Sequence, residues 1–335
     1  MTSNLNWRDA TGPTDIIPSV HQSEKSAEML HLISQFTLTQ GDCAGQRFGD
    51  AMLPWQRNLY ASMFSDGIRE VGLKCGKGSG KTVMLSALAL AIVMYYAGKK
   101  KHYRSSVILL SANIDTANIS FNHILEAINI DPHLEPLFKV HLAKREITHK
   151  ASGITIKITP PSIGNAVGRR CVALLVDEVF VAAQENKDFA AVVDQLRKGG
   201  GNFGEDFLHF SITTAPTARS EGYYTQWLAK MRAVRDGKIA DSAVLPCLYE
   251  FPHDSTTIEV DDPEQWWRGM PSLRTDMNPL GTMDAAQLQR ELDEAVQDAE
   301  LTGGNSLELL LSQRLGIEPD ERKGGGLTPL AESWN

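Results

Sequence analysis

A glycine-rich segment is the part of the chain best suited to chemistry. It lies between the apolar segment Val71–Cys75 and a long apolar run, and it reads Gly76-Lys77-Gly78-Ser79-Gly80-Lys81-Thr82. Glycines let successive backbone N–H groups turn toward one anion, and the N-terminus of a following helix favours negative charge. In a phosphate-binding loop, Lys81 would reach the β- and γ-phosphates of a nucleotide and Thr82 would bind Mg²⁺. Cys75 replaces the first glycine of the pattern GxxxxGK[ST], and a plain glycine-rich turn is the alternative.

Two adjacent carboxylates follow a second apolar segment. Asp177 and Glu178 come directly after Val172–Val176. In ATP hydrolysis one carboxylate can hold Mg²⁺ through water, and a second can orient and deprotonate the attacking water. An Asp-Glu pair after a strand is common in itself, but together with the glycine-rich segment it predicts a hydrolysing ATPase. We expect Asp177 to be the metal ligand and Glu178 the catalytic base.

Two shorter motifs are also compatible with a nucleotide site. Thr213 and Thr214 end an apolar segment, and their hydroxyls could contact the γ-phosphate or its water and couple hydrolysis to movement. Satisfied turns are the alternative for such threonines. Pro54-Trp55-Gln56 precedes the first expected strand, and the Gln56 amide can both donate to and accept from the edge of adenine. Packing in the core is the alternative for this motif.

Short apolar segments alternate with helical patterns along the middle of the chain. The expected strands are Val71–Cys75, Val107–Ala112, Ile154–Ile158, Val172–Val176 and Leu208–Thr213. The expected helices between them are Gly80–Tyr96, Asn113–Ile128 and Asp188–Leu196. Apolar strands separated by helices are typical of a parallel sheet in an α/β fold. The prediction is an α/β P-loop NTPase of the ASCE type, with a mainly parallel sheet flanked by helices and a small C-terminal lid or linker subdomain.

Changes in composition divide the chain into four expected parts. These are an N-terminal arm (1–50), the ATPase core (51–245), a lid or linker subdomain (246–318) and a flexible linker or truncated end (319–335). Helical spacing of apolar residues predicts an amphipathic helix over Glu24–Leu38 in the arm and a charged one over Asp284–Leu301 in the lid.

Composition excludes several classes of protein. The 335 residues carry a net charge of −8, which argues against a globally basic nucleic-acid binder but not against a local basic groove. Four scattered cysteines predict neither a disulfide framework nor a zinc site and favour a reducing compartment. The apolar run Val83–Ala97 is shorter than the roughly 20 residues that span a bilayer, so it predicts a buried helix. A soluble, intracellular protein is expected.

The ordered set of motifs resembles the ATPase part of the large terminase subunit of tailed bacteriophages. That family carries an adenine motif PWQ, a loop similar to GRGSGK[ST], a strand that ends in Asp-Glu, and a Thr-Thr coupling motif. The matching segments are Pro54–Gln56, Gly76–Thr82, Leu174–Glu178 and Thr213-Thr214, and Asp262–Glu264, Trp266-Trp267 and Met270–Leu273 look like a later segment of the family. The resemblance covers residues 51–315.

The resemblance implies specific activities and partners. The implied activities are ATP hydrolysis with Mg²⁺ and translocation of double-stranded DNA into a procapsid. The implied partners are the portal of the procapsid, a small terminase subunit and other copies of the chain in a homo-oligomeric ring on the capsid. The implied location is the cytoplasm of an infected bacterial host, with no membrane. A helicase-like ATPase is an alternative, although residues after Leu245 are too few for a second motor domain. A nucleotide-dependent scaffold is another, although a pure binder does not need Glu178.

Two departures from the family pattern matter. Lys77 stands where the family often has an arginine that stabilises charge, and an ammonium lacks the planar fork of a guanidinium. We expect Lys77 to contribute to catalysis, and Arg169 or Arg170 to act as a finger on a neighbouring subunit, with solvated surface arginines as the alternative. Complete family members also continue into a nuclease domain. Glu291, Asp293 and Glu294 instead have the pattern of a solvated helix face, so no nuclease site is expected.

Overall fold

The architecture comes from a computed structural model, which describes residues 7–17, 23–217, 222–251, 262–276, 278–279 and 281–318. Its largest unit is an eight-stranded sheet of order β3-β4-β5-β2-β6-β7-β1-β8. The strands are β1 (Glu70–Lys74), β2 (Ser106–Leu110), β3 (Phe138–His141), β4 (Glu146–His149), β5 (Thr155–Thr159), β6 (Cys171–Val176), β7 (Leu208–Thr213) and β8 (Val244–Leu248). From β5 to β8 all neighbours are parallel, while β3 and β4 extend one edge in antiparallel pairing.

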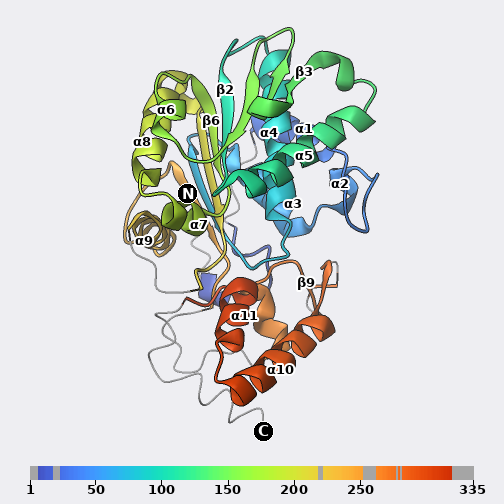
Figure 1. Ribbon diagram of the computed structural model, residues 1–335, viewed down its shortest axis with the longest axis vertical. Helices are drawn as coiled ribbons and strands as arrows, with labels where there is room; N and C mark the ends of the chain where they lie inside the picture. The colour runs from blue at the N-terminus through green and yellow to red at the C-terminus, as the bar shows by residue number, and fades with distance from the viewer. Residues whose placement is uncertain are drawn as a thin grey trace.

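Helices cover both faces of this sheet (Figure 1). They are α1 (Glu24–Ser34), α2 (Phe48–Ala51), α3 (Pro54–Met63), α4 (Lys81–Gly98), α5 (Ile114–Ile130), α6 (Ile163–Ala166), α7 (Val179–Glu185), α8 (Phe189–Gly200) and α9 (Tyr223–Arg235). Helices α1, α3, α4 and α5 lie on one side, and α6 to α9 lie on the other. The predicted mainly parallel α/β fold is therefore confirmed.

A smaller unit lies beyond the carboxyl ends of the parallel strands (Figure 1). It contains the short helix η5 (Pro263–Arg268), the short strands β9 (Leu273–Arg274) and β10 (Met283–Asp284), and the helices α10 (Ala285–Thr302) and α11 (Ser306–Leu315). A second apolar core, separate from the main one, holds it together around Trp266, Leu292 and Leu315. We call residues 262–318 the lid.

The N-terminal residues pack into the main core. Trp7, Ile17, Met29 and Ile33 are all buried there. Helix α1 begins at an N-cap, Ser23, whose side chain accepts a hydrogen bond from the Ser26 amide, and the helix ends at Ser34 rather than at the expected Leu38. The boundaries of the four expected parts remain a prediction, and the expected flexible end, 319–335, lies outside the described residues.

Helix α4 is the central helix of the main core. By length and composition alone it could cross a membrane, because its 18 residues extend past both ends of the expected apolar run. The helix is therefore longer than the apolar run Val83–Ala97. However, 67% of this 18-residue stretch is buried inside the protein, where the helix contacts β2, β5, β6, α1 and α5. The prediction of a buried core helix is confirmed.

Candidate functional site

The glycine-rich segment forms the turn between β1 and α4. Gly78 (φ +98°) and Gly80 (φ +75°) both lie in the left-handed region that other residues avoid, so the turn depends on glycine at these two positions. Gly80 is the N-cap of α4, and Lys81 is its first residue. The loop thus meets the positive end of a long helix, in the strand–loop–helix order that a phosphate site requires.

Lys81 is held inside this loop. Its ammonium is buried and donates hydrogen bonds to the carbonyls of Cys75 and Gly76, each at 3.1 Å. Its Nζ also lies 3.7 Å from Oε1 of Glu178. The arrangement joins the loop to the Asp-Glu pair and leaves one positive charge at the centre of the site.

Asp177 and Glu178 lie at the carboxyl end of β6. The Asp177 amide donates to Leu110 of β2, and its carboxyl group is buried. Burial, reinforced by the charge of Glu178, raises the pKa of Asp177 to about 7, and Lys81 opposes the shift. No side-chain hydrogen bond or ion pair to the Asp177 carboxyl group occurs within the described part of the chain. A buried carboxylate lacking donors is a group whose charge a bound cation would compensate.

Glu178 adopts a backbone conformation that is costly for a non-glycine residue. Its φ is +53°, and strain of this kind typically costs about 1–3 kcal/mol and occurs at functional sites. The turn directs its side chain toward β7, where Oε2 accepts hydrogen bonds from the amide (2.9 Å) and hydroxyl (3.0 Å) of Thr214. Glu178 therefore lies between Lys81 of the loop and Thr214.

Of the Thr-Thr pair, Thr214 contacts the Glu178 carboxylate, whereas Thr213 contacts backbone groups beside it. Thr213 donates its hydroxyl to the Thr214 carbonyl (2.9 Å) and accepts from the Phe180 amide (3.4 Å) at the start of α7. The two hydroxyls thus tie the end of β7 to Glu178 and α7. Direct contact of Thr213 or Thr214 with a phosphate or its water remains a prediction.

Trp55 and Gln56 lie on α3 behind the loop. Trp55 is buried against Tyr249, with ring centroids 5.4 Å apart. Gln56 is also buried, and it accepts from the Leu53 amide (3.0 Å) and donates to the Ser79 carbonyl (3.3 Å). Gln56 therefore supports the loop, whereas Trp55 has the environment of a core residue. Contact with adenine remains a prediction for both.

The lid contacts the first residues of the glycine-rich loop. The amides of Gly76 and Lys77 donate to the carbonyls of Gly269 and Gln313, each at 2.6 Å. A Cβ at Gly76 would lie 1.9 Å from the Arg314 carbonyl oxygen, so only glycine allows this approach. Lys77 itself is exposed at the junction.

Arg314 is the residue of this junction that the sequence interpretation missed. Its Nη1 donates to the Lys77 carbonyl (3.3 Å), while Nε and Nη2 donate to Glu291 at 2.9 and 3.0 Å. The interpretation of Glu291 as part of a solvated face is therefore wrong, since this carboxylate is partly buried in a bidentate ion pair. No local pattern signals a pairing between α10 and α11.

Arg169 and Arg170 lie at the opposite edge of the sheet. They precede β6, whereas Asp177 follows it, so the length of the strand, about 20 Å, separates them from the site of their own chain. The Arg170 guanidinium lies over the Phe203 ring, 5.8 Å from its centroid. The two arginines are therefore out of reach of the site of their own chain, and the finger role on a neighbouring subunit remains a prediction.

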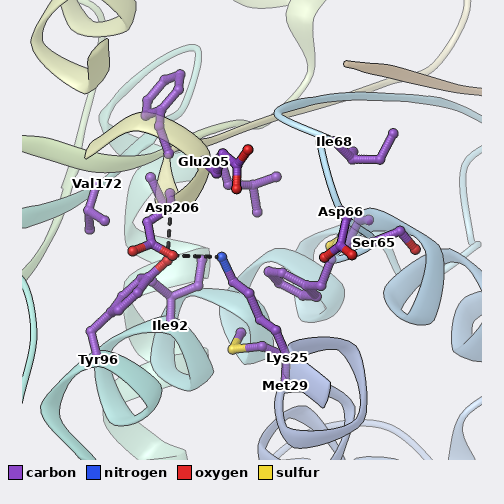
Figure 2. A pocket seen from close by; sticks show the side chains of 16 residues that line it. Lys25, Met29, Ser65, Asp66, Ile68, Ile92, Tyr96, Val172, Glu205 and Asp206 are labelled. Carbon is purple, nitrogen blue, oxygen red and sulfur yellow. Dashed lines mark hydrogen bonds and ion pairs between the residues drawn. The ribbon is translucent and has the colours of Figure 1, made fainter. Parts of the chain in front are cut away.

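A small cavity of about 100 Å³ also lies at that opposite edge (Figure 2). Asp206 points into it and accepts from Lys25 at 3.1 Å and pairs with His102 at 2.9 Å. Burial raises the pKa of Asp206, but the hydrogen bonds from His102 and Lys25 outweigh it and hold the pKa below its usual value. The cluster joins α1, the turn after α4 and the turn before β7, and it is remote from the glycine-rich loop.

The donor set at the loop suits Mg²⁺ and a nucleotide. Asp177 and Thr82 offer a carboxylate and a hydroxyl, which are hard oxygen ligands, and Mg²⁺ commonly takes only one or two such ligands besides phosphate and water. The described residues contain no group of three or more His, Cys, Asp or Glu side chains placed to hold a metal without such help.

Comparison with known proteins identifies the fold. No protein-family model matches the chain, and no curated protein matches it. The crystal structure of the HK97 bacteriophage large terminase superposes with a TM-score of 0.65 at 17% identity, over 88% of this chain and 55% of that one. The chain thus spans just over half the length of that protein. The Thermus phage P74-26 large terminase ATPase domain matches over 78% of this chain and 92% of its own, at 13% identity and a TM-score of 0.44. The chain has the fold of the HK97 large terminase in the region that the two share, and the predicted resemblance is confirmed at the level of the fold.

Proposed function

We propose that the chain is the ATP-hydrolysing motor of a large terminase, which translocates double-stranded viral DNA into a procapsid. The observation that carries the proposal is the position of Glu178, held by Thr214 and beside Lys81 of the glycine-rich loop. A structural carboxylate would not need a strained backbone turn that directs it toward a buried lysine. The shared fold with the HK97 protein supports the same interpretation.

The residues of the site divide the work of hydrolysis among them. Backbone amides of the loop and Lys81 bind the phosphates, and Lys77 adds positive charge at the rim. Asp177 and Thr82 would hold Mg²⁺, which neutralises charge on the β- and γ-phosphate oxygens when bound. Glu178 orients the attacking water and accepts its proton, while Thr214 fixes the carboxylate in the required orientation.

The partners follow from the proposed role. They are ATP and Mg²⁺ at the loop, duplex DNA gripped through its phosphates without regard to sequence, and a portal, a procapsid and a small terminase subunit in the host cytoplasm. Assembly into a homo-oligomeric ring belongs to the same proposal. The expected lack of nuclease activity on DNA also remains a prediction.

The proposal is tested by ATP turnover with and without duplex DNA. We expect turnover that duplex DNA stimulates, and no separation of the strands. ATP-dependent unwinding would favour a helicase-like ATPase. Negligible turnover at saturating Mg²⁺ and DNA, with nucleotide still bound, would favour a scaffold and contradict the proposal.

A further inference from the structure

The guanidinium of Arg314 lies against the glycine-rich loop. Its Nη1 donates to the Lys77 carbonyl at 3.3 Å, and a Cβ built on Gly78 would lie 3.4 Å from the same nitrogen. Lys81 donates to the carbonyls of Cys75 and Gly76, so the two cations contact three successive carbonyls of one loop. Arg314 and the phosphate-binding lysine therefore flank the same short stretch of backbone.

Two sets of contacts fix Arg314 in this place. On the backbone side, the Lys77 amide donates to the carbonyl of Gln313, the neighbour of Arg314 on α11. On the side-chain side, Glu291 of α10 accepts two hydrogen bonds from the guanidinium in a fork. A bidentate pair of this kind sets the plane of the guanidinium as well as its position. Its side chain is 23% exposed, so the guanidinium is not fully enclosed by these contacts.

We infer that Arg314 is the arginine that stabilises the charge of the transferred phosphoryl group, supplied in cis by the lid and positioned by Glu291. The inference rests on the proposed ATPase function. Phosphoryl transfer places negative charge on the outer phosphate oxygens, and a planar guanidinium matches them better than the ammonium of Lys77. The lid thus provides the planar fork that position 77 lacks. A finger from another subunit, such as Arg169 or Arg170, is then not required for turnover.

The test compares Arg314→Ala and Arg314→Lys with Arg290→Ala, an exposed arginine of α10 in the same lid. Turnover and the affinities for a non-hydrolysable ATP analogue and for ADP are measured for each. We expect Arg314→Ala to lower kcat at least about 100-fold and to weaken the analogue about 10-fold with ADP affinity unchanged. Arg314→Lys recovers analogue binding but not kcat, and Arg290→Ala matches the wild type.

A purely structural role would give a different pattern. If Arg314→Ala weakens ADP and the analogue equally, or leaves kcat and both affinities at wild-type values, the inference is wrong. Glu291→Gln covers the case in which Arg314→Ala does not fold. This variant keeps the size of the side chain but removes its charge and one of the two acceptor oxygens, and it should lower kcat severalfold without changing ADP affinity. A wild-type kcat for Glu291→Gln and Arg314→Lys would also overturn the inference.

Mixing two variants separates action in cis from action in trans. Lys81→Ala retains Arg314 but lacks a working loop, and Arg314→Ala has the opposite defect. We expect no recovery of turnover on mixing, and recovery would overturn action in cis. The proposed function fails separately: it is wrong if the wild type does not hydrolyse ATP, or if Lys81→Ala hydrolyses it equally well.

Discussion

Two buried carboxylates at the carboxyl edge of the sheet differ in whether basic side chains compensate their charge. Glu250, just after β8, accepts hydrogen bonds from Lys74 (3.0 Å), Arg232 (2.7 Å) and Arg235. Asp177, just after β6, is also buried but has no such donors among the described side chains. A compensated buried charge contributes to one fixed structure, whereas an uncompensated one is costly until a cation arrives.

The compensated cluster also connects the lid to the sheet. Lys74 ends β1 and lies at the start of the loop, and it contacts Glu250, where the chain leaves β8, and both the Gly316 carbonyl (2.8 Å) and Glu318 (2.9 Å), where the lid ends. Lys74 therefore contacts the chain both before the lid begins and where the lid ends. The comparison suggests that Glu250 serves stability and Asp177 serves function.

The largest expected effect is the loss of ATP turnover on substitution of Lys81, which lies beside Asp177 and Glu178 in the glycine-rich loop. Lys81→Ala should reduce ATP turnover at least about 100-fold, because it removes the charge nearest the outer phosphates. Its far-ultraviolet circular dichroism should match the wild type, since the loop depends on its glycines for its shape. Turnover within a few-fold of the wild type would contradict the assignment.

A matched pair of variants tests the contrast itself. Glu250→Ala should lower the free energy of unfolding by about 3–5 kcal/mol, since it removes the carboxylate that Lys74, Arg232 and Arg235 share and leaves these cations close together. Asp177→Asn should leave that free energy unchanged or raise it, because it removes a charge that lacks donors and adjoins Glu178. Urea unfolding without nucleotide measures both. An equal loss of unfolding free energy in the two variants would show that the two carboxylates contribute equally to stability, which would contradict the contrast.

A pH effect of intermediate size is expected at β7. Burial is the main cause that lowers the pKa of His209 from 6.5 to about 4, with Arg197 and Lys230 adding to it and Glu70 opposing it. The unfolded chain therefore binds the proton more readily between these values, and stability falls as the pH drops below 6.5. From pH 7 to pH 5 the loss is about 2 kcal/mol. His209→Gln should reduce the pH dependence of the unfolding free energy by this amount, and an unchanged slope would contradict it.

The smallest effect concerns the orientation of the base. Thr214→Val removes one hydrogen bond to Glu178 and leaves the backbone one, so turnover should fall about 10-fold at unchanged nucleotide affinity. Thr214→Ser keeps the hydroxyl and should retain nearly full turnover. If the valine variant is as active as the serine variant, the Thr214 hydroxyl does not position the base.

Local patterns in the sequence predicted those parts of the molecule that local chemistry determines. The glycine-rich loop, the strand before Asp177 and the helix after Gly80 all lie where their residues indicated. The strands β3 and β4 were missed, since they are short and half-exposed, and so was α9. The pairing of Glu291 with Arg314 and the contacts of the lid with Gly76 join distant segments, and no spacing in the sequence encodes them.

The central claim is that this edge of the sheet binds ATP and that Glu178 starts its hydrolysis. The most direct measurement incubates each protein with Mg²⁺ and ATP, removes free nucleotide rapidly, and identifies the bound nucleotide by chromatography. Glu178→Gln should retain unhydrolysed ATP at about one per chain, because glutamine keeps the shape of the site and loses the base. The wild type should hold ADP, and Lys81→Ala should hold little nucleotide. ADP formed by Glu178→Gln at the wild-type rate, or equal retention by Lys81→Ala, would contradict the account.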